Sequence, residues 1–259
     1  MIGAASEGVT LATLARRRAE IGPEVEAVAD DEDNLAFGPL LAQSEALAVS
    51  LHEIGLRRRD VLSFQLPNWR ETAILNVAAS LAGMVCNPIV PIYRDAELGA
   101  ILRDSGARCL VVPGTWRGYD YARAAARLRH GLPDLQHIVT VRAATPGMLA
   151  LEELIAAGRG RASPNDGADA DDVKLLLFTS GTTGRAKGVQ HSQRSLTAPM
   201  LRAMRHWGIG AGDGVIMPSP VTHVTGYCCG LELPFTLGTR TLLMERWDAD
   251  RALALVGNR

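Results

Sequence analysis

Segments with helical apolar periodicity alternate with short apolar extended segments along most of the chain, and this alternation limits the fold more than any other feature. Helices are predicted over 42–54, 69–82, 96–105 and 119–130, and strands over 61–66, 85–90, 109–112 and 137–141. Two of these helices end at Gly55 and Gly106, because glycine readily takes the left-handed conformation that terminates a helix. Strand–helix–strand repeats build parallel sheets with helical crossovers, so the expected fold class is α/β, with repeated β-α units and mostly parallel sheets.

A stretch rich in Gly, Ala, Asp and Pro at 158–172 interrupts this alternation and has no apolar period, so it is predicted to be a surface linker. It separates a first α/β subdomain, 1–157, from the start of a second, 173–259. The second contains predicted strands at 173–178, 214–217 and 240–244, and helices capped by Ser192 and Asp248.

Directly after the predicted strand 173–178, one loop combines hydroxyls, glycines and a lysine: Thr179, Ser180, Gly181, Thr182, Thr183, Gly184 and Lys187. Glycines let backbone N–H groups approach an anion closely, and hydroxyls can donate to phosphate oxygens. Lys174 and Lys187 are the only lysines of a chain that otherwise uses arginine. A lysine's flexible stem suits a phosphate that moves during a reaction. The loop therefore predicts a polyphosphate site at the carboxyl end of a strand.

An ordinary surface turn is the alternative interpretation of such a Gly, Ser and Thr cluster. The preceding strand, the density of hydroxyls and the lysine favour a phosphate site. The pattern is not a Walker A loop, which requires Ser or Thr directly after Gly-Lys, because Lys187 follows Ala186 and precedes Gly188.

Residues 179–188, followed by His191, resemble the signature loop of the adenylate-forming superfamily, which includes acyl-CoA synthetases and aryl-acid ligases. Segments 60–69 and 87–94 resemble early segments of carboxylic acid:CoA ligases. Segment 218–226 resembles the motif that follows the loop and borders the acyl pocket. These segments occur in the family's order, so the resemblance covers nearly the whole chain.

The resemblance implies the large N-terminal domain of an AMP-dependent carboxylic acid:CoA ligase, which uses ATP, Mg²⁺, coenzyme A and a small carboxylic acid. A carboxylate attacks the α-phosphorus of ATP, pyrophosphate leaves, and the thiol of coenzyme A opens the mixed anhydride. The resemblance assigns contact with ATP and pyrophosphate to the loop residues named above. It assigns the acyl pocket to His223, Val224, Thr225 and Gly226.

Several positions carry a second interpretation. Gly226 and Gly230 could admit substrate close to the backbone or could serve helix packing, and His191 is interpreted as a structural partner of the loop. Ala186 stands where the family commonly has proline, and Phe178 stands where tyrosine is frequent. Both departures reduce the preorganisation expected of the loop without removing its other polar groups.

The family's later motifs, which contact adenine, ribose and magnesium and supply the adenylation lysine, have no counterpart in the sequence. We therefore expect the fold to be incomplete at its C-terminal end, to lack a magnesium ligand and to be inactive alone. Three interpretations remain open: a fragment of a ligase, a noncatalytic remnant or interaction module, and half of a split ligase completed by a C-terminal polypeptide. The acid is expected to be a fatty or aromatic acid, and the catalytic residues are not assigned.

The charge balance and the cysteine spacing bear on nucleic-acid binding, on metal binding and on the cellular compartment. The 27 Lys and Arg residues balance 28 Asp and Glu residues, so a nucleic-acid footprint is not expected. The four cysteines show no metal-ligand spacing, which favours a reducing cytoplasm and no metal site. We see no signal peptide and no apolar run of membrane-spanning length, which would need about 18 to 20 residues.

Overall fold

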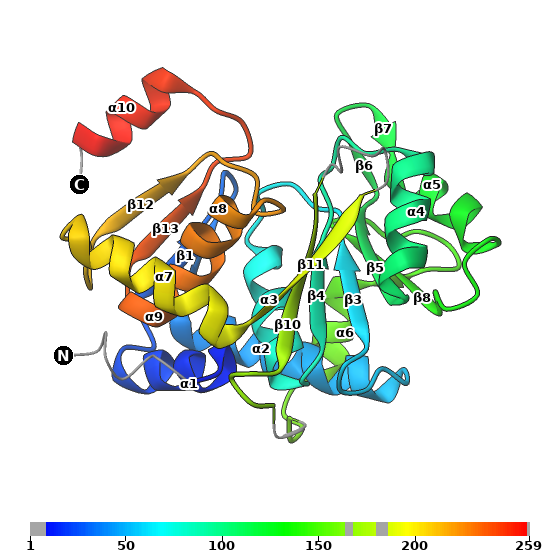
Figure 1. Ribbon diagram of the computed structural model, residues 1–259, viewed down its shortest axis with the longest axis horizontal. Coiled ribbons are helices and arrows are strands. Elements are labelled where there is room, and N and C mark those ends of the chain that lie inside the picture. The colour runs from blue at the N-terminus through cyan, green and yellow to red at the C-terminus, as the bar shows by residue number, and fades with distance from the viewer. Residues whose placement is uncertain (1–8, 164–167, 180–185, 258–259) are drawn as a thin grey trace.

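The computed structural model describes residues 9–163, 168–179 and 186–257, and two sheets form its framework (Figure 1). The larger sheet has seven strands in the order β11-β10-β4-β3-β5-β8-β9, and all neighbours are parallel except β10 and β11. These strands are β3 (Val61–Phe64), β4 (Val85–Pro88), β5 (Ala107–Pro113), β8 (His137–Val141), β9 (Leu149–Ala150), β10 (Val173–Thr179) and β11 (Lys187–Ser192).

The second sheet has four strands in the order β12-β13-β1-β2. They are β1 (Glu26–Ala29), β2 (Asn34–Ala36), β12 (Gly214–Met217) and β13 (Arg240–Leu243), and only β1 and β2 are antiparallel. A small ribbon joins β6 (Thr115–Trp116) to β7 (Tyr119–Asp120). In Figure 1 the carboxyl ends of the parallel strands of both sheets point toward the top of the molecule.

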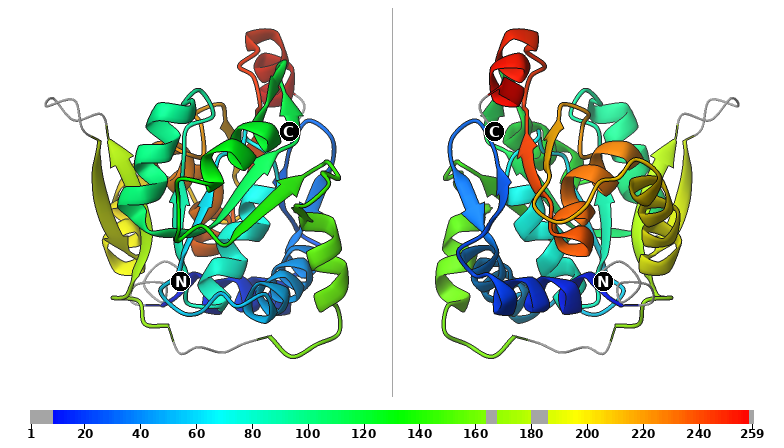
Figure 2. Two further views of the ribbon diagram at one scale, coloured as in Figure 1. Left: turned by 90° about the vertical axis from the view of Figure 1, so that its right-hand side faces the viewer. Right: turned by 90° about the vertical axis from the view of Figure 1, so that its left-hand side faces the viewer.

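Helices cover the sheets. They are α1 (Leu11–Ile21), α2 (Phe37–Glu53), α3 (Glu71–Leu81), α4 (Asp95–Ser105), α5 (Tyr121–Arg129), α6 (Leu151–Gly158), α7 (Gln193–His206), α8 (Val224–Gly226), α9 (Leu233–Leu237) and α10 (Ala249–Gly257), with a π-helical turn η1 (Tyr227–Glu232) between α8 and α9. Figure 2 shows the hairpin of β10 and β11 along one side and α10 at the top. None of the helices in the described residues has both the length and the apolar content needed to cross a bilayer.

The alternation of side chains along β5 explains how both faces of the larger sheet are buried. Cys109 and Val111 lie in the core shared with α2, α3 and α6. Leu110 and Val112 point to the opposite face and lie in the core formed with α4 and α5. Because successive residues of a strand face opposite sides, one apolar run serves both layers, as is usual for buried parallel strands.

The predicted α/β class with mostly parallel sheets is confirmed. Some boundaries differ from the prediction. The segment predicted as one helix from residue 119 begins with the short strand β7, and α5 starts at Tyr121. Asp120 caps this helix, because its side chain accepts from the backbone N–H of Arg123. The sheets do not follow the division at 158–172. Strands β10 and β11 complete the larger sheet, whereas β1 and β2, from the start of the chain, belong to the smaller one. Strand pairing does not test independent folding, so the division into 1–157, 158–172 and 173–259 stays a prediction.

Candidate functional site

The hairpin of β10 and β11 presents the two ends of the predicted phosphate loop. Thr179 is the last residue of β10 and Lys187 the first of β11, and the two are partners in the antiparallel ladder. The hydroxyl of Thr179 lies 3.5 Å from the carbonyl oxygen of Lys187. Both side chains are exposed. The remaining predicted loop residues, Ser180, Gly181, Thr182, Thr183 and Gly184, lie outside the described residues.

Gly188 allows the hairpin to pack closely. A Cβ atom at this position would lie 3.0 Å from Cδ1 of Leu176 and 3.3 Å from Cζ of Phe178. Phe178 is therefore in contact range of the glycine that follows Lys187. This glycine serves packing within the hairpin.

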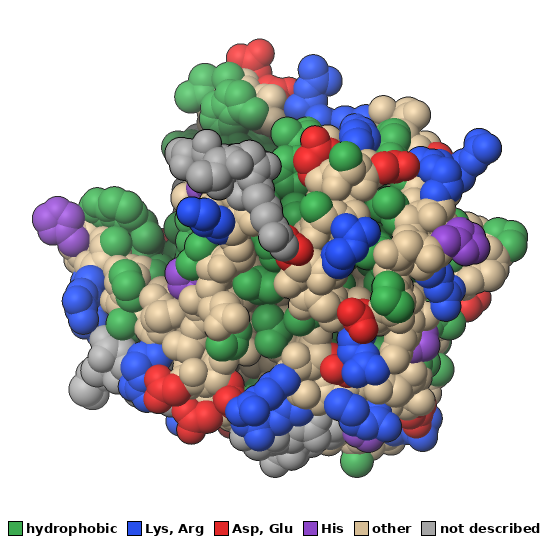
Figure 3. All heavy atoms as spheres, turned by 45° about the vertical axis from the view of Figure 1, so that its right-hand side comes forward, with side chains coloured by type: hydrophobic (Ala, Val, Ile, Leu, Met, Phe, Trp, Pro, Cys, Tyr) green, Lys and Arg blue, Asp and Glu red, His purple; other side chains and the backbone are tan. Residues whose placement is uncertain are grey.

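A groove of about 860 Å³ runs beside the hairpin. Its lining combines apolar side chains of the strands, among them Leu176 and Phe178, with Lys187 and with Asp104 from the end of α4. Figure 3 shows this side of the molecule, where apolar side chains are visible between charged ones. The groove therefore gives the Lys187 end of the hairpin a partly apolar surface next to its positive charge.

The predicted acyl-pocket motif follows β12. His223 precedes the first turn of α8, its backbone N–H donates to the Pro220 carbonyl at 2.9 Å, and its carbonyl accepts from the Tyr227 N–H at 2.8 Å. The side chains of His223, Val224 and Thr225 are exposed, whereas Gly226 is buried. The motif thus displays three side chains on a short segment whose backbone is held at both ends.

Gly226 packs against the backbone of its own motif, as the helix-packing interpretation expects. A Cβ atom there would lie 2.1 Å from the Pro220 carbonyl oxygen and 2.7 Å from that of Ser219. Gly230 also lies among side chains, with Leu243, Met217 and Val221 between 3.2 and 3.4 Å from such an atom.

Gly226→Ala is expected to lower the free energy of unfolding by about 2 kcal/mol, because the backbone of the motif must move to admit the methyl group. Urea denaturation measures this loss. Gly210→Ala is the matched control, since nothing lies within 4 Å of a Cβ atom at that glycine. Equal stability losses in the two variants would contradict the packing role of Gly226.

The side chain of Asn68, near the end of the segment 60–69, binds the backbone at the start of the motif 218–226. Its side-chain amide nitrogen lies 3.2 Å from the carbonyl oxygen of Met217, 3.0 Å from that of Ser219 and 3.0 Å from that of Met244. Its oxygen accepts from the Val221 N–H at 2.9 Å. The sequence indicated this segment only through the resemblance; the structure shows that Asn68 ties the larger sheet to the strand ends from which the motif emerges.

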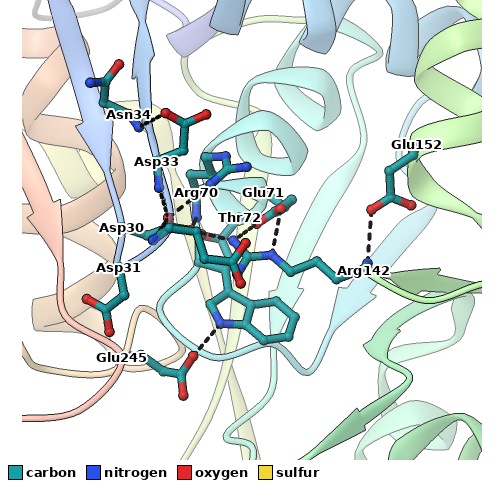
Figure 4. Close-up of polar contacts among 12 residues, drawn as sticks. Asp30, Asp31, Asp33, Asn34, Arg70, Glu71, Thr72, Arg142, Glu152 and Glu245 are labelled. Carbon is teal, nitrogen blue, oxygen red and sulfur yellow. Dashed lines mark hydrogen bonds and ion pairs between the residues drawn. The ribbon is translucent and has the colours of Figure 1, made fainter.

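A second connection between the sheets is ionic and lies at their carboxyl ends (Figure 4). Asp30, which follows β1, pairs with Arg70 at 3.0 Å and with Arg142 at 2.5 Å, and its side chain is 1% exposed. Arg142 follows β8, binds Glu71 through two contacts of 2.9 Å and stacks 4.3 Å from the ring centroid of Trp69. These contacts set the placement of the four-stranded sheet against the seven-stranded one.

Glu245, just beyond β13, adds to this connection. Its carboxylate accepts from the indole N–H of Trp69 at 2.7 Å and from that of Trp116 at 2.8 Å. The carboxylates of Asp30, Glu71 and Glu245 therefore bind arginine and tryptophan side chains of the framework.

The cysteines do not favour thiolate chemistry. Burial raises the pKa of Cys86 to about 11, that of Cys109 to about 12 and that of Cys228 to about 12. Burial also raises the pKa of Cys229. The nucleophilic form of cysteine is the thiolate. Because their pKa values are raised, these groups remain protonated thiols at neutral pH.

A comparison with known families decides the identity of the chain. The family model described as AMP-binding enzyme matches residues 15–258. The chain belongs to the AMP-binding enzyme family. Its fold agrees: it superposes on the apo structure of MbtA from Mycobacterium smegmatis with a TM-score of 0.85 and 26% identity, covering 96% of this chain and 46% of that one.

Curated relatives within the family are ligases. The chain is 29% identical to a medium-chain fatty-acid–CoA ligase of Escherichia coli K12, over 95% of this chain and 44% of the relative. It is 33% identical to a salicyl-AMP ligase / salicyl-S-ArCP synthetase of Mycobacterium tuberculosis, over 96% of this chain and 45% of the relative. The chain thus spans a little under half the length of these AMP-binding relatives.

The Mg²⁺ ion that the family resemblance implies has no preformed cluster of protein ligands in the part of the chain that the structure describes. There, no group of three or more His, Cys, Asp or Glu side chains is arranged to hold a metal ion.

Proposed function

We propose that this chain carries the pyrophosphate-binding and acid-binding part of an ATP-driven carboxylic acid:CoA ligase. The observation that carries the proposal is the position of its two motifs. The carboxyl end of β10, at Thr179, and the helix α8 (Val224–Gly226), which follows β12, both lie toward the end of the molecule where the parallel strands of both sheets terminate (Figure 1). In open α/β sheets, ligands bind at the carboxyl ends of strands.

In this proposal, the loop residues Thr179, Ser180, Gly181, Thr182, Thr183 and Gly184, with Lys187, contact the phosphates of ATP. Hydroxyl and ammonium donors around the β- and γ-phosphates would stabilise the charge that builds on pyrophosphate as it leaves. The exposed ammonium of Lys187 stands on a paired strand, so the position of its backbone is fixed before the ligand arrives.

The exposed side chains of His223, Val224 and Thr225 would border the acid, while Gly226 keeps the segment tight against Pro220. The names of the relatives support a medium-chain or an aromatic carboxylic acid as substrate. Coenzyme A would then accept the acyl group. Contacts with Mg²⁺ and with the rest of ATP would come from a C-terminal part such as the longer relatives have, either in the same chain or in a complementing polypeptide. A cytoplasmic location stays a prediction.

Lys187→Ala is expected to weaken the binding of inorganic pyrophosphate at least about tenfold, because a hydrogen bond to a charged group contributes about 1.5 to 3 kcal/mol. Isothermal titration calorimetry of the purified chain measures the affinity. Arg202→Ala, which removes an exposed cation from α7, is the control and should bind as the unaltered chain does. Absence of binding by the unaltered chain, or equal affinity after Lys187→Ala, would count against the proposal.

Octanoate and salicylate are the corresponding probes for the acid site. Binding of one of them, weakened by substitution of His223 and unaffected by Arg202→Ala, would support the acyl-pocket assignment and choose between an aliphatic and an aromatic substrate. Binding of pyrophosphate without either acid would instead favour a noncatalytic phosphate-binding module.

A further inference from the structure

The turn that follows the acyl-pocket motif is a π-helix, a rare local structure. It covers Tyr227–Glu232, and the backbone N–H of Leu233 donates to the carbonyl of Cys228, five residues earlier. Because π-turns have wider rings than α-helices, they are uncommon and frequently occur at functional sites. This one begins immediately after Gly226. The shape of this π-turn therefore helps to set the position of the motif from His223 to Gly226.

Both ends of the π-turn bind one side chain of α3. The Tyr227 hydroxyl donates to Oδ1 of Asn76 at 2.5 Å, and Nδ2 of Asn76 donates to Oε1 of Glu232 at 2.9 Å. In a regular α-helix, two residues five positions apart point about 140° away from each other. The wider π-turn brings Tyr227 and Glu232 to the same side, where Asn76 can reach both.

Lys174 completes this arrangement from β10. Its ammonium lies 2.7 Å from Oε1 of Glu232 and 5.8 Å from the ring centroid of Tyr227. Gln193, the first residue of α7, accepts from Lys174 at 3.0 Å and donates to the other Glu232 oxygen at 2.7 Å. Lys174 thus contacts both ends of the π-turn, from the strand whose far end carries Thr179.

The ion pair is deeply buried, since Lys174 is 9% exposed and Glu232 is fully buried. Removing two charges from water is costly, and buried pairs of this kind seldom add net stability over apolar residues of the same size. Their value here is geometric, because the pair, with Asn76 and Gln193, selects one shape of the turn.

We propose that Lys174 and Glu232 are positioning residues that hold the turn Tyr227–Glu232 in its π form and thereby fix His223, Val224 and Thr225 relative to the hairpin. If the turn relaxed to an α-helix, one residue would be rotated by about 100° and shifted by about 1.5 Å along the axis. The backbone bond from Tyr227 to the His223 carbonyl would transmit that change to the motif. The functional meaning of this position rests on the proposed function, whereas the control of the turn does not.

Cysteine alkylation by N-ethylmaleimide, mapped by mass spectrometry, tests the control of the turn. Cys228 and Cys229 lie within it and are partly exposed, while Cys109 is buried in the core on β5 and reports on global unfolding. The variant Lys174→Met/Glu232→Gln removes both charges together and keeps side chains of similar length. Its alkylation at Cys228 and Cys229 is expected to rise about tenfold through local opening, with Cys109 still unlabelled.

The matched control is Arg194→Met/Asp171→Asn, which neutralises an exposed ion pair next to Gln193 and should leave alkylation unchanged. Should the buried double variant fail to fold, Tyr227→Phe decides the question, because it removes the hydroxyl contacts with Asn76 and Cys86 and leaves the ion pair of Lys174 and Glu232 in place. It should raise the alkylation of Cys228 and Cys229 several-fold. Alkylation equal to that of the unaltered chain, in whichever of the two variants folds, would overturn the proposal.

A ligand measurement separates this inference from the proposed function. The double variant should bind pyrophosphate as the unaltered chain does, because the hairpin keeps its own ladder, and should bind octanoate or salicylate at least about tenfold more weakly. Acid affinity unchanged in a folded double variant overturns the positioning role. If the unaltered chain binds neither ligand, the proposed function fails, while the alkylation result still decides whether the pair controls the turn.

Discussion

Asp30→Asn is expected to lower the free energy of unfolding by about 3 kcal/mol at neutral pH, because it removes the buried carboxylate that pairs with the partly buried Arg70 and Arg142. The Asp30 carboxylate accepts from the guanidinium groups of Arg70 and Arg142 and from the backbone N–H groups of Arg70, Glu32 and Asp33. An asparagine cannot accept from all these donors, since its NH₂ group would face some of them. The loss should also loosen the connection between the two sheets.

The effect should depend on pH in a defined direction. Burial by itself raises the pKa of Asp30, but hydrogen bonds from the backbone of Arg70, Glu32 and Asp33 and from the Arg142 side chain outweigh it and hold the pKa below its ordinary value. The unfolded chain binds this proton more tightly, near the ordinary pKa of about 3.9. The stabilisation is therefore fully present above that pH and is lost as pH falls through the lower pKa of the folded state.

Urea denaturation of the unaltered chain and of Asp30→Asn, from neutral pH down to pH values below that of the free carboxyl, measures both effects. Asp31→Asn is the matched control, because Asp31 is the adjacent aspartate and its ion pair with Arg251 is much more exposed. Its expected loss is below about 1 kcal/mol. A difference between the unaltered chain and Asp30→Asn that stays constant over the whole pH range would refute the assignment.

Local sequence patterns predict the framework well. The strands around residues 61, 85, 109 and 137 and the helices between them follow from apolar periodicity and from glycines such as Gly106, whose φ of 63° ends α4 as expected. The strand that delivers the phosphate loop was also predicted, and it ends one residue later, at Thr179. These features depend on interactions between residues close in the chain.

Features that depend on distant partners were not predictable in this way. Strand β1 pairs with β13, more than two hundred residues later, and its four residues show no signal that names this partner. The π-turn depends on Asn76 and Lys174, which belong to other elements. The sequence distinguishes Lys174 only by the rarity of lysine in the chain. Its burial against Glu232 required the packed structure.

Asn68→Asp is expected to lower the free energy of unfolding by about 3 to 4 kcal/mol, because it places a carboxylate against backbone carbonyls that lose their donor. The two side chains have nearly the same shape, so the change is almost purely one of hydrogen bonding. Asn68 is 5% exposed, and its amide nitrogen points at the carbonyl oxygens of Met217, Ser219 and Met244. An ionised aspartate has acceptors only.

Urea denaturation measures the loss, and Asn34→Asp is the control, since Asn34 is exposed on β2 and should change stability by less than about 0.5 kcal/mol. Because Asn68 holds the strand ends from which the motif at 218–226 emerges, the variant should also bind octanoate or salicylate more weakly while its affinity for pyrophosphate is retained. A variant with unchanged stability would show that the contacts of Asn68 contribute no net free energy. Equal losses of acid and pyrophosphate affinity would show that Asn68 supports the whole fold. Its contacts with Ser219 and Val221 would then have no specific effect on the motif.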